Sequence, residues 1–133
     1  MKLSTRGRYG LRMLIDLSLQ SEKIVSLPSI AKRQEVSANY LELVAKDLRR
    51  AGYIRSVKGA NGGYSLINEP KNIFIGDVLS LLEGDVRITD EYINKESILQ
   101  ECIRENVYDP LNKRLSELFY ATTLDDIIKN SNS

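Results

Sequence analysis

The sequence contains no histidine and only one cysteine, Cys102, among its 133 residues. Histidine is the commonest general base and metal ligand in proteins, and one thiol is too few for a structural zinc site. A single cysteine also cannot form a disulfide within the chain, which agrees with a reducing compartment. These absences predict a protein that is not an enzyme and that holds no metal ion.

The chain also lacks any run of about eighteen apolar residues, so no membrane-spanning helix is expected. Near the N-terminus, Arg12 and Asp16 interrupt the apolar segment that a signal peptide would need. The glycine-rich segment 59–63 (GANGG) lacks the Lys-Ser/Thr pair of a phosphate-binding P-loop. We therefore expect a cytoplasmic protein with no membrane partner.

Acidic residues are scarce in the first half of the chain. Residues 1–68 hold twelve Lys/Arg and five Asp/Glu, a balance of +7, whereas residues 69–133 hold seven and thirteen, a balance of −6. Each cation brought to a phosphate releases condensed counterions, so the basic half suits a nucleic acid and the acidic half is expected to face away from it.

Residues 26–66 carry the pattern of a winged helix-turn-helix. Ser26 caps a predicted helix over residues 27–34, and Ser37 caps a second one over residues 38–51. The apolar residues of the second helix fall on one face at spacings of three and four, namely Leu41, Val44, Ala45 and Leu48. An alternation over residues 53–58, the GANGG loop and a return run then predict a hairpin, to which residues 24–25 add a third strand.

Three further helices are predicted, over residues 6–19, 75–82 and 124–129. Ser4 or Thr5 caps the first, Gly84 ends the second, and Thr123 caps the third. The polar residues 85–95 are interpreted as a loop. The fold class is thus mainly α with a small β-wing, divided into a winged helix-turn-helix domain over residues 1–84 and a second part over residues 85–133.

The second part carries an apolar stripe at helical spacing that starts near residue 96. Its members are Ile98, Leu99, Cys102, Ile103, Val107, Leu111, Leu115, Leu118 and Phe119. A small winged domain does not need a helix this long to close its core, so we expect it to pack on the same helix of a second subunit. The alternative is a helix folded back on its own domain. Pro110 either kinks this helix or, with Asp109, caps and opens another.

Four segments, MKLSTRGRYGLRML, SIAKRQEVSANYLELVAKDLRRAGYIRSVKGANGGYSL, IGDVLSLLEG and TTLDDI, resemble in order and spacing the IscR/CymR/NsrR family of bacterial winged-helix transcription regulators. The resemblance implies a homodimer, held by the long C-terminal helix, that binds an inverted repeat in double-stranded DNA, usually as a repressor. It implies that DNA contacts come from Lys2, Thr5, Arg6, Tyr9, Ser37, Asn39, Tyr40, Glu42, Leu43, Lys58 and Asn61.

Two of these positions have a second interpretation or a consequence of their own. Tyr40 suits core packing as well as DNA contact. Leu43 stands where relatives often have glutamine, and it can touch a thymine methyl group but cannot make the bidentate contact to adenine. The operator is therefore expected to differ from that of well-known members.

The resemblance fails where cluster-binding members supply three cysteines and a further ligand. Cys102 matches the last cysteine, while Asp90, Glu96 and Glu105 stand at the other positions. Iron–sulfur clusters need chiefly thiolates, so no cluster is expected. This places the chain beside cluster-free, CymR-like members, which resemble sensors of cysteine supply that act through cysteine synthase.

The role of Cys102 and the function itself each keep an alternative. We expect Cys102 to be a small buried apolar residue, and the alternative is a redox-responsive or metal-responsive regulator that uses its thiol. The expected function is a repressor of cysteine and sulfur metabolism genes. A rival from another class is a winged-helix protein-interaction subunit that no longer binds DNA, which Leu43 supports and the basic half opposes.

Overall fold

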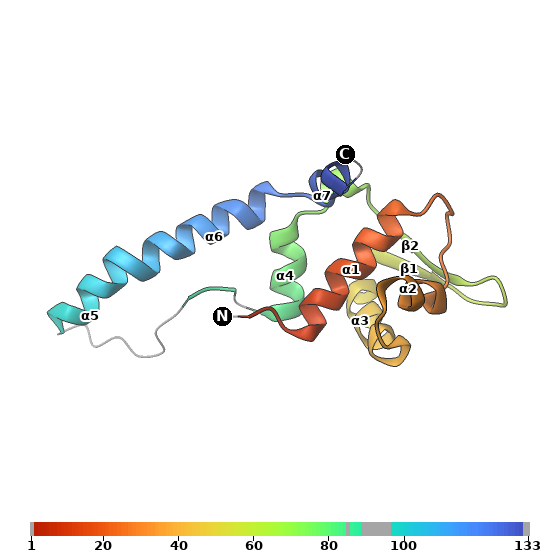
Figure 1. Cartoon of the computed structure of the whole chain (residues 1–133), viewed down its shortest axis with the longest axis horizontal. Coiled ribbons are helices and arrows are strands. Elements are labelled where there is room, and N and C mark those ends of the chain that lie inside the picture. The colour runs from red at the N-terminus through yellow and green to blue at the C-terminus, as the bar shows by residue number, and fades with distance from the viewer. Residues whose placement is uncertain (1, 85, 89–96, 132–133) are drawn as a thin grey trace.

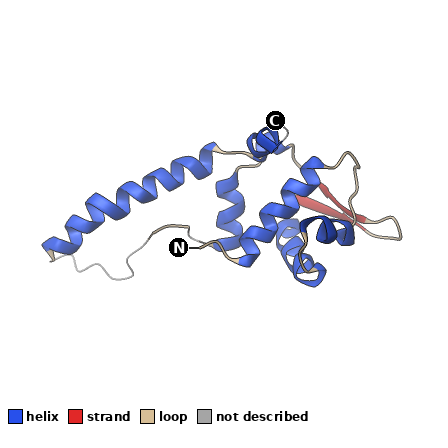
Figure 2. Ribbon diagram, viewed as in Figure 1, coloured by secondary structure: helices blue, strands red, loops and turns tan. Residues whose placement is uncertain are grey.

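The computed structural model describes residues 2–84, 86–88 and 97–131, which form a winged domain and a long helical arm (Figures 1 and 2). The winged domain begins with α1 (Thr5–Leu19), α2 (Leu27–Gln34), α3 (Ala38–Arg50), β1 (Ile54–Val57) and β2 (Gly63–Leu66). A 3-10 turn, η1 (Pro70–Asn72), and α4 (Ile75–Glu83) follow. The predicted class, mainly helical with a small antiparallel sheet, is confirmed. No helix in the described ranges is long and apolar enough to cross a membrane.

Serine side chains start the first three helices, as predicted. The hydroxyl oxygens of Ser4, Ser26 and Ser37 each accept a hydrogen bond from the backbone N–H three residues on, at 3.2–3.3 Å. These bonds satisfy N–H groups that have no partner within a helix. Glu35, with φ of 54°, turns the chain from α2 toward α3, and Gly52, with φ of 86°, ends α3. The helix-turn-helix is therefore fixed locally, by caps and turns.

The core lies where α2, α3 and α4 pack around α1. Its fully buried side chains include Met13, Leu14, Ile30, Leu41, Leu48, Ile54, Leu79 and Leu124. Gly7 and Gly10 let α4 approach α1 closely, because a Cβ on either glycine would overlap the side chain of Glu83 or Leu82. The predicted inward face of α3 is confirmed, since its four apolar residues are all buried.

The wing is a two-stranded hairpin in which Ile54 pairs with Leu66 and Val57 pairs with Gly63. The predicted third strand is reduced to a single bridge, in which Val25 and Tyr64 exchange backbone hydrogen bonds of 2.9 and 2.8 Å. The chain leaves this bridge at once because Ser26 caps α2. The wing is thus tied to the residue that precedes the helix-turn-helix.

The arm is a single helix assigned as α5 (Ile98–Ile103), a π-helical segment η2 (Arg104–Tyr108) and α6 (Asp109–Ala121). Tyr108 and Asp109 keep helical backbone angles, so Pro110 neither ends the helix nor opens a separately capped one. Proline removes an N–H and crowds the carbonyl four residues earlier, and the wider π-helical turn accommodates both effects. The arm extends away from the winged domain and contains no buried residue, so the folded-back alternative is wrong (Figure 1).

After the arm, the chain returns to the winged domain as α7 (Leu124–Ser131). Leu124 is fully buried in the core, and its N–H donates to the carbonyl of Ile73 at 3.0 Å. The division expected between residues 84 and 85 therefore needs a correction, because α7 belongs to the winged domain. Thr123 caps α7 as predicted, and its backbone and side-chain hydrogen bonds lower the pKa of Asp126 below its usual range. The predicted loop 85–95 lies mostly outside the described residues.

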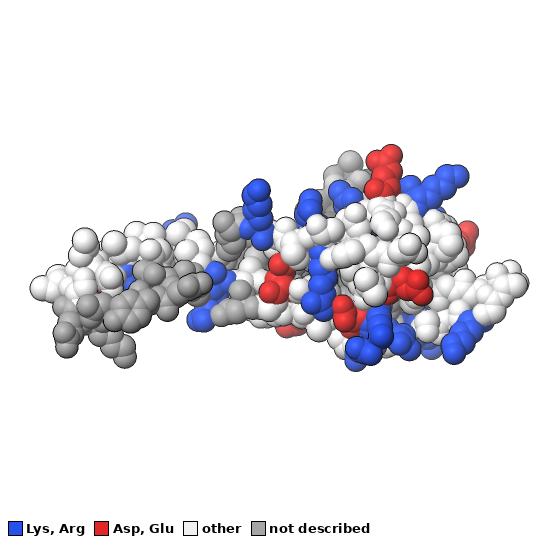
Figure 3. Space-filling view, turned by 90° about the horizontal axis from the view of Figure 1, so that it is seen from below, with Lys and Arg blue, Asp and Glu red and all other residues white. Residues whose placement is uncertain are grey.

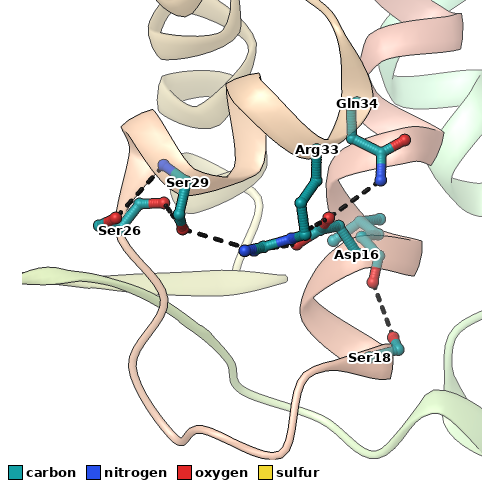
Figure 4. A network of polar contacts seen from close by, with 7 residues as sticks. Asp16, Ser18, Ser26, Ser29, Arg33 and Gln34 are labelled. Carbon is teal, nitrogen blue, oxygen red and sulfur yellow. Dashed lines mark hydrogen bonds and ion pairs between the residues drawn. The ribbon is translucent and has the colours of Figure 1, made fainter.

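One buried carboxylate joins α1 to α2 (Figure 4). Asp16 is 1% exposed and accepts hydrogen bonds from Nε and Nη2 of Arg33, at 3.0 and 2.8 Å, and from Nε2 of Gln34, at 2.9 Å. Nη2 of the same guanidinium also donates to Oγ of Ser29, at 3.4 Å. The hydrogen bond to Asp16 also raises the pKa of Arg33. A buried charge is tolerated only with such partners.

Replacing Arg33 is expected to destabilise the winged domain. Arg33→Ala leaves the buried Asp16 with Gln34 as its remaining partner, so we expect a loss of about 2–3 kcal/mol in the free energy of unfolding. Urea denaturation followed by circular dichroism measures it. The control is Lys32→Ala, which removes an exposed neighbouring cation and should change stability by about 0.5 kcal/mol or less. Equal losses in the two variants would contradict the role of the pair.

Candidate nucleic-acid interface

An open groove of about 890 Å³ separates α3 from the wing. The start of α2 closes one end of it, and the outer face of α3 forms its wall. The residues that line it are Ser26, Leu27 and Pro28 from α2 and its cap, Glu42, Leu43, Lys46 and Arg49 from α3, and Ser56 to Ala60 with Gly62, Gly63 and Tyr64 from the wing. A convex helix beside a protruding hairpin is the geometry with which winged domains meet a duplex.

The groove is electropositive. Lys46, Arg49 and Lys58 are exposed, and within the described part of the chain none of them forms a hydrogen bond or an ion pair, so their charges face solvent. Glu42 is the only carboxylate among the lining residues. Figure 3, which views the molecule from below, shows Lys and Arg side chains gathered over α3 and the wing. Unpaired cations on a protruding surface are the main source of affinity for phosphates.

The outer face of α3 carries the groups that can read bases. Asn39, Glu42 and Leu43 are exposed, as predicted for a recognition helix. Leu43 is 61% exposed although the opposite face of the same helix is buried. An exposed leucine on this face suits contact with the methyl group of thymine in a major groove.

Five of the predicted DNA-contacting residues have partners within the chain, and one of them is Thr5, whose hydroxyl accepts a hydrogen bond of 3.2 Å from Nη2 of Arg8. Arg6 binds Asp47 of α3, with Nη2 2.8 Å and Nε 3.1 Å from Oδ2. Tyr9 meets the ring of Tyr40 edge to face, with centroids 5.2 Å apart. The hydroxyl oxygen of Ser37 caps α3. These side chains hold the recognition helix against α1, and the core-packing interpretation of Tyr40 fits this structure.

Other predicted residues lie exposed where they can face a duplex. Lys2 is exposed just before α1, and Lys58 and Asn61 are exposed in the wing. Two glycines of the wing lie too close to other backbone to carry a side chain. A Cβ on Gly62 would overlap the carbonyl of Val57, and a Cβ on Gly63 would overlap that of Val25. The glycines of the GANGG loop are therefore needed for close backbone packing.

Three features of the groove were not predicted from the sequence: the cations Lys46 and Arg49, and the contribution of the start of α2. Lys46 follows Leu43 by three residues and Arg49 follows Lys46 by three, so the helical spacing that placed Leu43 outward also places them on the groove. Ser26 was predicted only as a cap, but it and Pro28 also line the groove. The helical period of the sequence could have identified these two cations. No signal in the sequence indicated that the start of α2 approaches the wing.

The predicted dimerisation residues form an apolar stripe along the arm. Ile98 is 88% exposed, Leu99 70% and Leu118 61%, while Val107 and Leu111 are also exposed. Ile103 and Leu115 are half-buried. Cys102 is exposed, so the expectation of a buried thiol is wrong for the single chain, because α5, the part of the arm that carries it, contains no buried residue. Phe119 packs instead against the core of the winged domain.

The basic groove, the exposed recognition helix and the hairpin define a winged-helix DNA-binding transcription regulator, and the comparisons with known proteins agree. Residues 3–130 match the family described as "Rrf2: Iron-dependent Transcriptional regulator". The chain belongs to the Rrf2 family. Its homologues and structural neighbours are regulators rather than enzymes, as predicted.

Individual relatives extend this result. The chain is 37% identical over 128 residues to CymR of Bacillus subtilis, covering 96% of this chain and 89% of that protein. The solved structure of B. subtilis CymR matches with a TM-score of 0.86 at 35% identity, covering 98% of each chain, and that of T. potens IscR with 0.78 at 36%, covering 98% of this chain and 88% of the other. Protein rrf2 of Nitratidesulfovibrio vulgaris is 51% identical over 84 residues, and this match spans 56% of its length.

Removing the wing cation is expected to weaken DNA binding through counterion release. In Lys58→Ala the affinity for duplex DNA falls, and the slope of log affinity against log salt decreases by about 0.9 for one lost phosphate contact. Fluorescence anisotropy at several salt concentrations measures both. The matched control is Lys71→Ala, because Lys71 is paired with Glu69 at 3.3 Å and does not line the groove. An unchanged slope in Lys58→Ala would place the wing outside the interface.

Proposed function

We propose that this protein is a homodimeric repressor that binds an inverted-repeat operator. The exposed apolar stripe of the arm is the observation that carries the proposal. Ile98, Leu99 and Leu118 leave large apolar surfaces in water that the winged domain does not cover. A contiguous apolar surface of this kind marks an interaction site, and a helix of this length suits pairing with its own copy.

A dimer of this kind would present two basic grooves. Two-fold symmetry makes the two recognition helices face half-sites in opposite orientation, and one helical turn of DNA separates them by about 34 Å. The groove of a single chain holds few unpaired cations, namely Lys46, Arg49 and Lys58. Linking two such sites raises the affinity for a paired operator without any new contact. The alternative of a subunit without DNA binding is not favoured, because the basic groove is open.

The proposal extends to cysteine and sulfur metabolism. CymR is the global cysteine regulator of B. subtilis, and its solved structure matches over nearly the whole chain. We assign the same class of target genes here, with cysteine synthase as a candidate partner. Comparing transcripts of a deletion strain with those of its parent, with and without added cysteine, tests this assignment. Sulfur genes that do not change would contradict it.

The proposal includes the absence of an iron–sulfur cluster, although the family description names iron. The whole sequence offers one thiol and no imidazole. The carboxylates near Cys102 are already bound to a cation, since Arg104 lies 2.6 Å from Glu101, 2.6 Å from Asp109 and 3.7 Å from Glu105. No group of three or more metal-binding side chains comes together within the described ranges. This donor set does not fit a cluster, which needs chiefly thiolates.

The remaining candidate ligands are Asp90 and Glu96, which lie outside the described residues. The protein purified without oxygen is expected to be colourless, and Cys102→Ser should bind duplex DNA within about twofold of the parent, since a thiol and a hydroxyl differ little in size. Absorption spectra, together with iron and sulfide assays, measure this. Stoichiometric iron and sulfide would contradict the proposal and make Asp90, Glu96 and Glu105 the ligands to test.

A charge in the apolar stripe is expected to separate the subunits. Leu111→Glu would bury a carboxylate in the interface, so sedimentation should show a monomer, and the affinity for a duplex with two half-sites should fall about a hundredfold. Lys113→Glu is the control, because Lys113 is exposed and two residues along a helix turn it away from Leu111. Its dimer should persist. A dimeric Leu111→Glu would place the interface elsewhere.

A further inference from the structure

The arm joins the winged domain through Tyr120, near the end of α6, and α4. The ring of Tyr120 lies on the backbone of Gly76, so closely that a Cβ on Gly76 would come within 2.8–3.0 Å of three ring carbons. The hydroxyl of Tyr120 lies 3.2 Å from Oγ of Ser80, one turn further along α4. The ring is therefore positioned at its face by a glycine and at its tip by a hydrogen bond.

Backbone hydrogen bonds hold the same place from the other side. The N–H of Ile75 donates to the carbonyl of Thr122 at 2.9 Å, directly beyond the end of the arm. Phe74 and Thr123 form an isolated bridge. These bonds fix where the arm ends. The contact between Tyr120 and Gly76 sets the direction in which it leaves, and two hydrogen bonds of 2.7 Å between the Asn112 side chain and the backbone of Ile88 support that direction further along α6. We call this pair, Gly76 with Tyr120, the joint.

The joint is also connected to the recognition helix through the core. Gly76 lies in α4, which packs along α1, and α1 in turn packs along α3. The direction of the arm is thus set against the part of the molecule that carries the recognition helix.

The arm is long enough to amplify a small rotation. Residues 98–121 span about 36 Å at a rise of about 1.5 Å per residue, so a rotation of about 5° at the joint moves the far end by about 3 Å. One base pair occupies about 3.4 Å along the duplex. We propose that the joint sets the angle between arm and winged domain, and thereby determines the spacing between the two half-sites that the protein accepts. This inference rests on the proposed homodimer.

Selection of duplexes from a random-sequence pool tests the joint, because the selected sequences report both the half-site and the spacing. Gly76→Ala inserts a methyl group beneath the ring, and Tyr120→Ala removes the ring. We expect Gly76→Ala to shift the preferred spacing by one base pair or more and Tyr120→Ala to broaden it. Affinity for the operator that the parent selects should fall about tenfold in both, while affinity for a single half-site stays within about twofold.

The control is Arg114→Ala, which changes an exposed residue on a different face of α6 from Tyr120 and should keep the spacing of the parent. Unchanged spacing and affinity in both joint variants would overturn the inference. Equal losses on single and paired half-sites would also overturn it, because they indicate damage to the winged domain. If Gly76→Ala does not fold, the spacing and affinity of Tyr120→Ala alone test the inference. A parent that selects only unpaired half-sites would overturn the homodimer itself, before any variant is made.

Discussion

The structure depends on one buried carboxylate. Asp16 lies in the last turn of α1, the helix around which the winged domain is built, and it is buried. Its partners, Arg33 and Gln34, form the end of α2, so the carboxylate positions the first helix of the helix-turn-helix by charge and by geometry. Apolar packing alone is tolerant of small rotations, whereas a bidentate bond between a guanidinium and a carboxylate is directional. The alignment of α2 controls that of α3, because a tight turn joins them.

Directional contacts also support the recognition helix on the side that faces α1. Arg6 and Tyr9 of α1 bind Asp47 and Tyr40 of α3, so two polar or aromatic contacts supplement the apolar core. The outer side is left with cations that have no partner in the described part of the chain and with an exposed leucine. The charged groups of α1 and α3 therefore have two roles. The groups between the two helices hold α3 in position, and the cations on the outer side of α3 are available to phosphates.

Much of this architecture was predictable because its signals are local. The caps Ser26 and Ser37, the period of α3 and the glycines of the wing each act within a few residues, and the structure confirms all of them. The partners of Arg6 were not predictable, because Asp47 is 41 positions away in the sequence. For the same reason the sequence indicated that a helix follows Thr123 but not that Leu124 completes a distant core.

Pro110 shows how a local rule can leave two outcomes open. A proline in a helical pattern either kinks the helix or caps and opens another, and both alternatives were expected. The second is wrong, because the backbone adopts a π-helical segment just before the proline and the helix continues without a separate cap. The candidate site was likewise predictable only in part. Outward positions on α3 follow from helical period alone, whereas the groove exists only because the wing, held by Val25, lies opposite α3.

The return of α7 to the core makes the arm an insertion between two parts of one domain. The chain leaves the winged domain after α4 and comes back to it with Leu124, which is fully buried. Cutting the chain before the arm would therefore also remove a core side chain and leave a cavity, which costs stability. A winged domain without its arm has to keep α7 and join it to the end of α4.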